Sequence, residues 1–250
     1  MNLGICSFIF LLGFQSMAQA STWKIATLEF PPHTCQKDCD GNGSMNKTLS
    51  EALKNVGVKT EFYWLPWSRA INETKKGKYI GYYPAWPEDC QSGFMFSETI
   101  SRSDLGIAER ISHPLMFKQA TDLAQYKIGT VQDYGNTKEI NEMIQKGILK
   151  SEMAVKDEMN IKKVALGRLD GALVDVSMLK HFLMYQHPEY KNLIQLNPTI
   201  IENKRMGICI RKSLWQSLNN TLKKAFKKVD PIKTSAEALK KHFASRAKKS

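Results

Sequence analysis

Residues 167–175, GRLDGALVD, combine a glycine turn, a short apolar run and a terminal carboxylate. A strand in the middle of a parallel sheet is buried on both faces, so its sequence is a continuous apolar run. Gly171–Val174 fits this pattern and predicts such a strand. Asp175 then stands at the carboxyl end of the strand, where open α/β sheets bind ligands. The stretch therefore predicts an α/β fold with a binding site near residue 175.

The first third of the mature sequence repeats the same strand-and-helix alternation. Apolar runs bounded by Pro or Gly predict three strands, and apolar residues at helical spacing predict two helices between them. The expected order is strand 23–28, helix 45–56, strand 58–64, helix 67–77 and strand 79–83. This alternation is typical of a doubly wound, mostly parallel sheet.

The pattern restarts after residue 102. We expect a strand at 105–108 with no helix before it, and then new strand–helix units. The expected later elements are a strand at 127–131, a helix with Ile140, Met143 and Ile144, a helix at 160–166, the strand at 171–174, a helix at 176–185, a strand at 206–210 and a long amphipathic helix from Leu214. The last helices have no strands of their own, so we expect them to return to the first sheet. The prediction is lobe 1 from 21–102 and 209–250, lobe 2 from 103–208, and two hinge crossings that leave a cleft.

The amino-terminal segment predicts export. Residues 1–20 are apolar through Leu12 and end in Ala18-Gln19-Ala20, a small-x-small pattern typical of a cleaved secretory signal. The apolar run is shorter than the roughly 20 residues that a membrane-spanning helix needs. We therefore expect cleavage after Ala20, a mature chain of about 230 residues, and location in the periplasm.

The net charge of +12 is concentrated at the carboxyl end, where residues 223–250 carry ten Lys or Arg. A basic tail can bind nucleic acid or anionic membranes. Here the charges alternate with Leu222, Ala225, Phe226 and Val229 at helical spacing. We interpret them as the solvated face of a helix and expect no nucleic-acid partner.

Four cysteines remain after the expected cleavage: Cys35, Cys39, Cys90 and Cys209. An even number in an oxidising compartment indicates disulfides, and three pairings are possible. Cys35 and Cys39 flank a short polar turn and could pair locally, and Cys90 could also lie near either of them. A metal site of His33, Cys35 and Cys39 lacks the second ligand pair that zinc sites normally have. We expect no metal and no cofactor.

These features together resemble the periplasmic solute-binding proteins of the polar amino-acid type, family 3 of the two-lobed type II class. The resemblance rests on motifs in the family's order along the whole mature chain, each of them weak by itself. They are the FPP turn at 30–32, PWSRAINETKKGK, FSETI, KIGTVQDYGNT, ALGRLDGALVD and MGICIRKSLWQSLNNTL. The resemblance implies hinge closure around a small solute and delivery to an importer powered by ATP hydrolysis, an ABC importer.

The resemblance also implies ligand contacts in lobe 2. Asp175 matches the acid that receives the ligand's ammonium group; it could instead cap the helix that begins at Val176, but the resemblance favours the ligand role. Gly135, Asn136 and Thr137 match the helix start that receives the ligand's carboxylate. Asn136 and Glu139 are spaced like a capping box, so the same segment could be a well-capped helix that binds nothing.

In lobe 1, Phe30 and Trp67 match the pair of rings that sandwiches the ligand side chain. Such rings provide apolar contact, or a cation–π face for a basic ligand, but either could belong to the core. Trp86 and Tyr83 are expected to line the same wall, and Arg69 could contact an acidic ligand or lie exposed on its helix.

One position departs from the family pattern. Amino-acid binders carry an arginine six residues before the FS of the first crossing, where it grips the ligand's α-carboxylate through two hydrogen bonds. Here that position is Cys90, preceded by Glu88 and Asp89. Unless Arg69 or Arg102 substitutes, ordinary α-amino-acid recognition is in doubt.

The functional prediction is a monomeric binding protein for a small amine-bearing solute that serves an ABC importer. One alternative is a ligand-binding module for a membrane sensor. Another is a dehydratase-type enzyme on the same fold, with Asp175 or Glu88 transferring protons. The sequence has no GxSxG, GxxxxGK or HExxH motif, so we predict no catalytic residue and favour binding over enzymatic activity.

Overall fold

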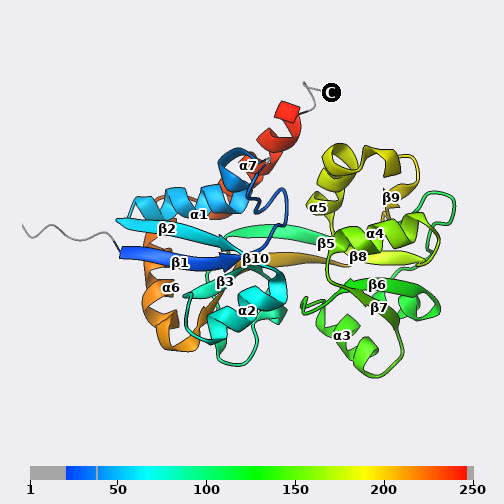
Figure 1. The fold of residues 1–250 in the computed structure, drawn as a ribbon, viewed down its shortest axis with the longest axis horizontal. Helices are drawn as coiled ribbons and strands as arrows, with labels where there is room; N and C mark the ends of the chain where they lie inside the picture. The colour runs from blue at the N-terminus through cyan, green and yellow to red at the C-terminus, as the bar shows by residue number, and fades with distance from the viewer. Residues whose placement is uncertain (1–20, 38, 247–250) are drawn as a thin grey trace, which may run out of the picture.

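A computed structural model describes residues 21–37 and 39–246. The predicted signal segment, residues 1–20, lies outside the described residues. The chain forms a sheet whose strand order is β2-β1-β3-β10-β5-β8-β6-β7. In addition, β4 pairs with β10 and β9 pairs with β5. Figure 1 shows two lobes placed end to end and joined by the long strands β5 and β10. The α/β, two-lobed prediction is confirmed.

Lobe 1 contains a parallel sheet in which β1 (Ser21–Thr27) pairs with β2 (Val58–Trp64) and β3 (Gly81–Ala85). Helix α1 (Ser44–Lys54) buries Met45, Leu49 and Leu53 at helical spacing. Helix α2 (Trp67–Lys75) follows β2, and the short strand β4 (Phe94–Phe96) pairs with β10. Short 3-10 turns lie at 40–42 and 87–89.

Lobe 2 repeats the arrangement, as β6 (Lys127–Val131) pairs in parallel with β7 (Lys150–Ala154) and β8 (Gly171–Asp175). All five residues of β8 are buried, as GRLDGALVD predicts. The remaining elements of this lobe are α3 (Lys138–Gln145), α4 (Asp157–Ala165), α5 (Val176–His181), β9 (Ile194–Leu196), a π-helical turn at 182–186, and 3-10 turns at 120–125 and 188–190.

The two crossings are one antiparallel ribbon. Strands β5 (Ser101–Arg110) and β10 (Glu202–Arg211) pair through Glu202–Met206, and β10 then pairs with β3 and β4 from Gly207 onward. The expected strands at 105–108 and 206–210 are thus too short. Most of their added residues are polar, and the hydrogen bond between the side chains of Asn203 and Asp104 is exposed to solvent. The residue bounds proposed for the lobes stay a prediction.

Other differences from the expected elements also have local causes. Strand β7 was not predicted, because KSEMA lies at an edge of the sheet and begins with three polar residues, which give little apolar signal. Helix α4 begins at Asp157 rather than 160, since acidic residues stabilise a first turn. The helix expected at 176–185 is α5 followed by the π-helical turn.

Helices α6 (Lys212–Phe226) and α7 (Pro231–Arg246) return to lobe 1, as expected, where both pack on α1 (Figure 1). Helix α7 also reaches lobe 2. Nδ1 of His181 lies 3.0 Å from Nε2 of His242, and the Tyr185 hydroxyl donates to the Phe243 carbonyl over 3.2 Å. Within the described residues, no helix is long and apolar enough to cross a bilayer.

Two disulfides form, Cys35–Cys39 and Cys90–Cys209. The local pair was one of the open possibilities. The alternative that placed Cys90 beside Cys35 or Cys39 is wrong, because β10 lies directly beside β3 and brings Cys209 to the loop that carries Cys90. No group of three or more His, Cys, Asp or Glu among the described residues could hold a metal ion.

Candidate ligand-binding site between the lobes

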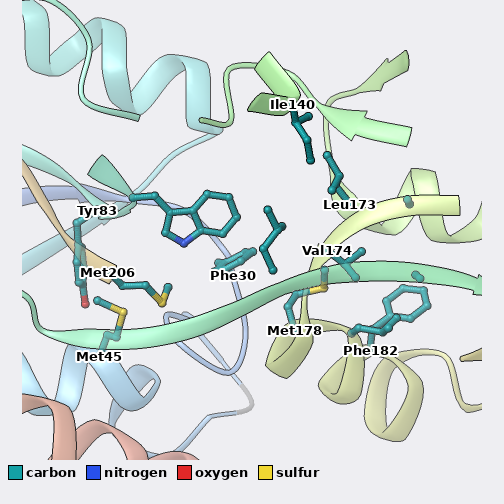
Figure 2. Close-up of a cluster of buried hydrophobic side chains, with 14 of the residues drawn as sticks. Phe30, Met45, Tyr83, Ile140, Leu173, Val174, Met178, Phe182 and Met206 are labelled. Carbon is teal, nitrogen blue, oxygen red and sulfur yellow. The ribbon is translucent and has the colours of Figure 1, made fainter. Parts of the chain in front are cut away.

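A cavity lies where the lobes meet. Its wall consists of Leu28, Phe30, Trp67, Pro84, Trp86, Asp89, Tyr134 and Met206. Tyr134 comes from lobe 2, and the other residues come from lobe 1 and the crossing strand β10. Figure 2 shows Phe30 between Met206 and Tyr83 on one side and Val174 and Leu173 on the other. The buried cluster is therefore continuous from one lobe to the other.

Three rings meet edge to face in the cavity wall. The Tyr134 ring lies 6.3 Å from Phe30 and 6.1 Å from Trp67, and it is nearly perpendicular to both. Aromatic pairs prefer this arrangement. The predicted placement of Phe30, Trp67 and Trp86 at one wall agrees with the cavity lining, while their contact with a ligand stays a prediction.

The loop after β6 also holds α2 of lobe 1. The Trp67 indole N–H donates to the Asp133 carbonyl over 2.9 Å, and the Ser68 hydroxyl donates to the Asp133 carboxylate. Asp133 has a φ of 61°, a left-handed conformation that Asp adopts more readily than most residues. The backbone carbonyl and the carboxylate of Asp133 thus both face lobe 1.

Gly135 is hydrogen-bonded across the cleft to a side chain of lobe 1. Its N–H donates to Oδ1 of Asp89 over 2.5 Å, and Oδ2 of Asp89 accepts the N–H of Trp86. A Cβ at residue 135 would lie 2.4 Å from the carbonyl carbon of Glu88, so only glycine allows this approach. Burial raises the pKa of Asp89 to about 7, although both N–H groups favour the ionised form.

Asp175 faces His33 of lobe 1. Its Oδ1 lies 3.1 Å from Nε2 of His33 and accepts the N–H of Met178 over 2.8 Å, and its Oδ2 accepts the Ser103 hydroxyl. Burial raises the pKa of Asp175, but the charge and hydrogen bond of His33, with those of Ser103 and Met178, outweigh it and leave the pKa below its usual value. Because Asp175 accepts the N–H of Met178, it caps α5, which was one of the two alternatives. A direct role in ammonium binding stays a prediction, and Asp175 does not line the cavity.

Three other candidates lie apart from the cavity. Tyr83 lies within β3, where its ring faces the Phe62 side of the sheet and packs in the core. Arg69 is exposed on α2. Asn136 is buried and bonds to Asn141.

The expected capping box of Asn136 and Glu139 is wrong by one residue. Thr137 caps α3 and accepts the N–H of Ile140 over 3.1 Å.

Sequence reasoning missed several cavity residues: Leu28, Pro84, Asp89, Tyr134 and Met206. Tyr134 had a usable signal, since it stands between Asp133 and Gly135 in the loop already singled out. Asp89 was noted only as a neighbour of Cys90. Its role was not visible because it depends on a partner 46 residues away in the sequence.

Acidic groups surround the Tyr134 side of the site. The Tyr134 hydroxyl donates to Asp157 over 3.1 Å, and burial raises the pKa of Asp157 to about 7. Asp89 and Asp175 also act on Tyr134, whose pKa burial raises well above 10. The nearest buried ammonium, Lys204, is paired with Glu88 over 2.7 Å and lies 5.3 Å from the centre of the Trp86 ring.

This architecture defines the fold of the two-lobed type II periplasmic binding proteins. An ancestral arginine-binding protein bound to arginine superposes with a TM-score of 0.72, at 18% identity over 90% of this chain and 99% of that chain. An amino acid ABC transporter substrate-binding protein of Streptococcus pneumoniae bound to L-arginine gives 0.67 at 18% identity, covering 89% and 96%. The GluR0 ligand-binding core of Nostoc punctiforme with L-glutamate gives 0.65 at 16%, covering 88% and 99%.

Sequence identities this low support a shared fold and no conclusion about the ligand. No protein-family model matches the sequence, and no curated protein matches it. The particular solute must therefore be argued from the residues of this chain.

Proposed function

We propose that this protein captures a small amine-bearing solute between its lobes in the periplasm and delivers it to an ABC importer. The supporting observation is the cavity at the junction of the lobes, walled by Phe30, Trp67 and Trp86 on one side and Tyr134 on the other. A solute held there contacts both lobes, so its binding energy favours the closed arrangement. The structural neighbour from Streptococcus pneumoniae, a substrate-binding protein of an amino acid ABC transporter, supports the importer as partner.

The proposed roles of the residues follow from their positions. Phe30, Trp67 and Trp86 provide ring faces for the solute. Trp67, through Asp133, and Gly135, through Asp89, hold the lobes together around it. Asp175 positions the start of α5 against His33.

A thermal-shift screen over amino acids, polyamines, organic acids and short peptides tests capture. A solute at one hundred times its dissociation constant adds about 2.7 kcal/mol, or roughly 5–10 °C in Tm for a chain of this length. Phe30→Ala should abolish the shift, whereas Tyr63→Ala, which removes an exposed ring outside the cavity, should preserve it. Equal shifts in the two variants would overturn the proposed site.

The alternatives to capture are a ligand-binding module for a membrane sensor and an enzyme. One structural neighbour is an ancestral amino-acid-binding protein described as a precursor of cyclohexadienyl dehydratase, which does not favour an enzyme over capture. Recovery of the bound solute unaltered after long incubation separates capture from catalysis. Loss of solute uptake in a deletion strain, restored by the gene, separates transport from sensing.

Export is part of the proposal. Fractionation of cells should place the protein in the periplasm, and its amino terminus there should be Ser21. Retention in the cytoplasm would contradict it.

A further inference from the structure

We propose that the solute is an organic cation without an α-carboxylate, such as a diamine or a guanidino-amine, and that Asp89 both excludes the carboxylate and receives the cation. This inference rests on the proposed capture function and names the class of solute for the same cavity.

The first step concerns the place where an anion could bind. The N–H of Gly135, at the loop that leads into α3, already donates to the carboxylate of Asp89. This carboxylate comes from lobe 1 of the same chain and is 7% exposed. A solute carboxylate would have to displace it or lie beside it, and two carboxylates in a buried site repel each other.

The second step concerns what the cavity offers instead. Its wall has the rings of Phe30, Trp67, Trp86 and Tyr134 together with one acidic side chain, Asp89. Ring faces attract ammonium and guanidinium groups, and the attraction is stronger away from water. Lys204 lies over the Trp86 ring, so this wall already engages one cation.

The third step is the balance of charge. Asp175 has His33 and Glu88 has Lys204 as partners. Among the described residues, no Lys, Arg or His forms an ion pair with Asp89 or Asp157, although the charge of Lys204, which is paired with Glu88, lowers the pKa of Asp89 from further away. A buried acid without a cation is costly in its ionised form. A cationic solute provides the missing charge, whereas a zwitterionic amino acid brings a second carboxylate.

Pairs of ligands that differ only in the carboxylate test this inference. Isothermal titration calorimetry at pH 8 should show agmatine binding at least about tenfold more tightly than arginine, and putrescine more tightly than ornithine. Equal or tighter binding of arginine and ornithine would overturn the inference.

Variants of Asp89 make the test specific to this residue. Asp89→Ala frees the N–H of Gly135, so the affinity ratio of agmatine to arginine should fall at least tenfold. Asp89→Asn keeps an oxygen for that N–H but removes the charge, and should weaken agmatine more than arginine. Because the two affinities of each ratio are measured on the same variant, an unfolded fraction lowers both equally and leaves their ratio unchanged. Asp40→Asn removes an exposed acid, whose side chain is 71% exposed, and should leave the ratio unchanged. An unchanged ratio in Asp89→Ala would overturn the role of Asp89.

The pH dependence provides a further readout. As pH falls through about 7, Asp89 gains a proton in the empty protein, so cation affinity should fall between pH 8 and pH 6. Affinity that is constant over this range would contradict binding through Asp89.

The two proposals fail in different ways. If another solute gives a thermal shift that depends on Phe30 while all four test ligands give none, capture stands and the cationic class is wrong. If no solute of the full screen binds, capture itself is wrong.

Discussion

His33 on the loop after β1 and Asp175 at the end of β8 form a buried hydrogen bond across the two lobes, although 142 residues separate them. Both side chains are fully buried. The acid that follows the strand of lobe 2 thus has a partner from lobe 1 within the protein itself. This pair, with Asp89–Gly135 and Trp67–Asp133, holds the closed arrangement together.

The His33–Asp175 pair should behave as one energetic unit. His33→Gln and Asp175→Asn should each lower the free energy of unfolding, and the double variant should cost less than the sum by about 1.5–3 kcal/mol, the value of a hydrogen bond to a charged group. Urea unfolding of the wild type and the three variants measures this coupling. Strictly additive losses would show that the contact contributes nothing.

Asp175→Asn also tests the predicted ammonium contact. If Asp175 receives the solute directly, this variant abolishes the thermal shift while His33→Gln does not. We expect Asp175→Asn and His33→Gln to change the ligand-induced thermal shift to a similar extent, since Asp175 lies outside the cavity wall.

Gly135→Ala should prevent closure without unfolding either lobe. The added Cβ would lie 2.5 Å from the backbone nitrogen of Asp89, a distance that neither backbone can relieve while the lobes stay together. We expect a larger radius of gyration by small-angle X-ray scattering and loss of the ligand-induced thermal shift.

Gly57→Ala is the matched control. A Cβ there has open space around it, but φ is +75°, so the variant should lose about 1 kcal/mol of stability and keep ligand binding. Binding by Gly135→Ala at wild-type affinity would contradict the close approach.

Stability of the empty protein should depend on pH through Asp89. Its folded pKa of about 7 exceeds the unfolded value of about 3.9. Between these values the folded state holds a proton that the unfolded state has released, so stability falls as pH rises from about 4 to about 7. Relative to Asp89→Asn, which has no proton to lose, the wild type should lose about 1–3 kcal/mol over this range.

Urea unfolding at pH 5, 6, 7 and 8 measures the difference. The difference in stability between the wild type and Asp157→Asn should depend on pH in the same way, because burial raises the pKa of Asp157 to about 7 as well. Parallel pH profiles of wild type and Asp89→Asn would refute a raised pKa at Asp89.

The two disulfides should contribute unequally. Cys90–Cys209 closes a loop with a sequence separation of 119, and Cys35–Cys39 one with a separation of 4. Longer loops restrict the unfolded chain more. Replacing Cys90 and Cys209 by Ala should cost about 2–4 kcal/mol and exceed the cost of replacing Cys35 and Cys39, as measured by guanidinium unfolding. Peptide mapping under non-reducing conditions checks the pairing itself, and an equal cost would contradict the loop-length argument.

Much of the fold was readable in the sequence because its signals are local. Continuous apolar runs such as Gly171–Val174 mark buried strands, and the spacing of Met45, Leu49 and Leu53 marks a helix face. Where the signal was weak, prediction failed. Strand β7 lies at an edge, and the parts of β5 and β10 that cross between the lobes are mostly polar, so their sequences resemble those of loops.

The site was predictable only in part. Phe30 and Trp67 were named from the family resemblance and Trp86 from its place after the third strand, and all three line the cavity. Tyr83 does not line the cavity, because alternation along β3 turns its ring to the Phe62 side of the sheet.

By itself, the sequence determined the strand–helix alternation, the restart after residue 102 and the set of rings and acids available to a site. Only the tertiary structure decided which of them meet: Asp89 with Gly135, His33 with Asp175, and Cys90 with Cys209. Secondary structure follows from side-chain periodicity within a few residues, whereas these contacts join segments that come together only when the crossing strands bring the lobes face to face.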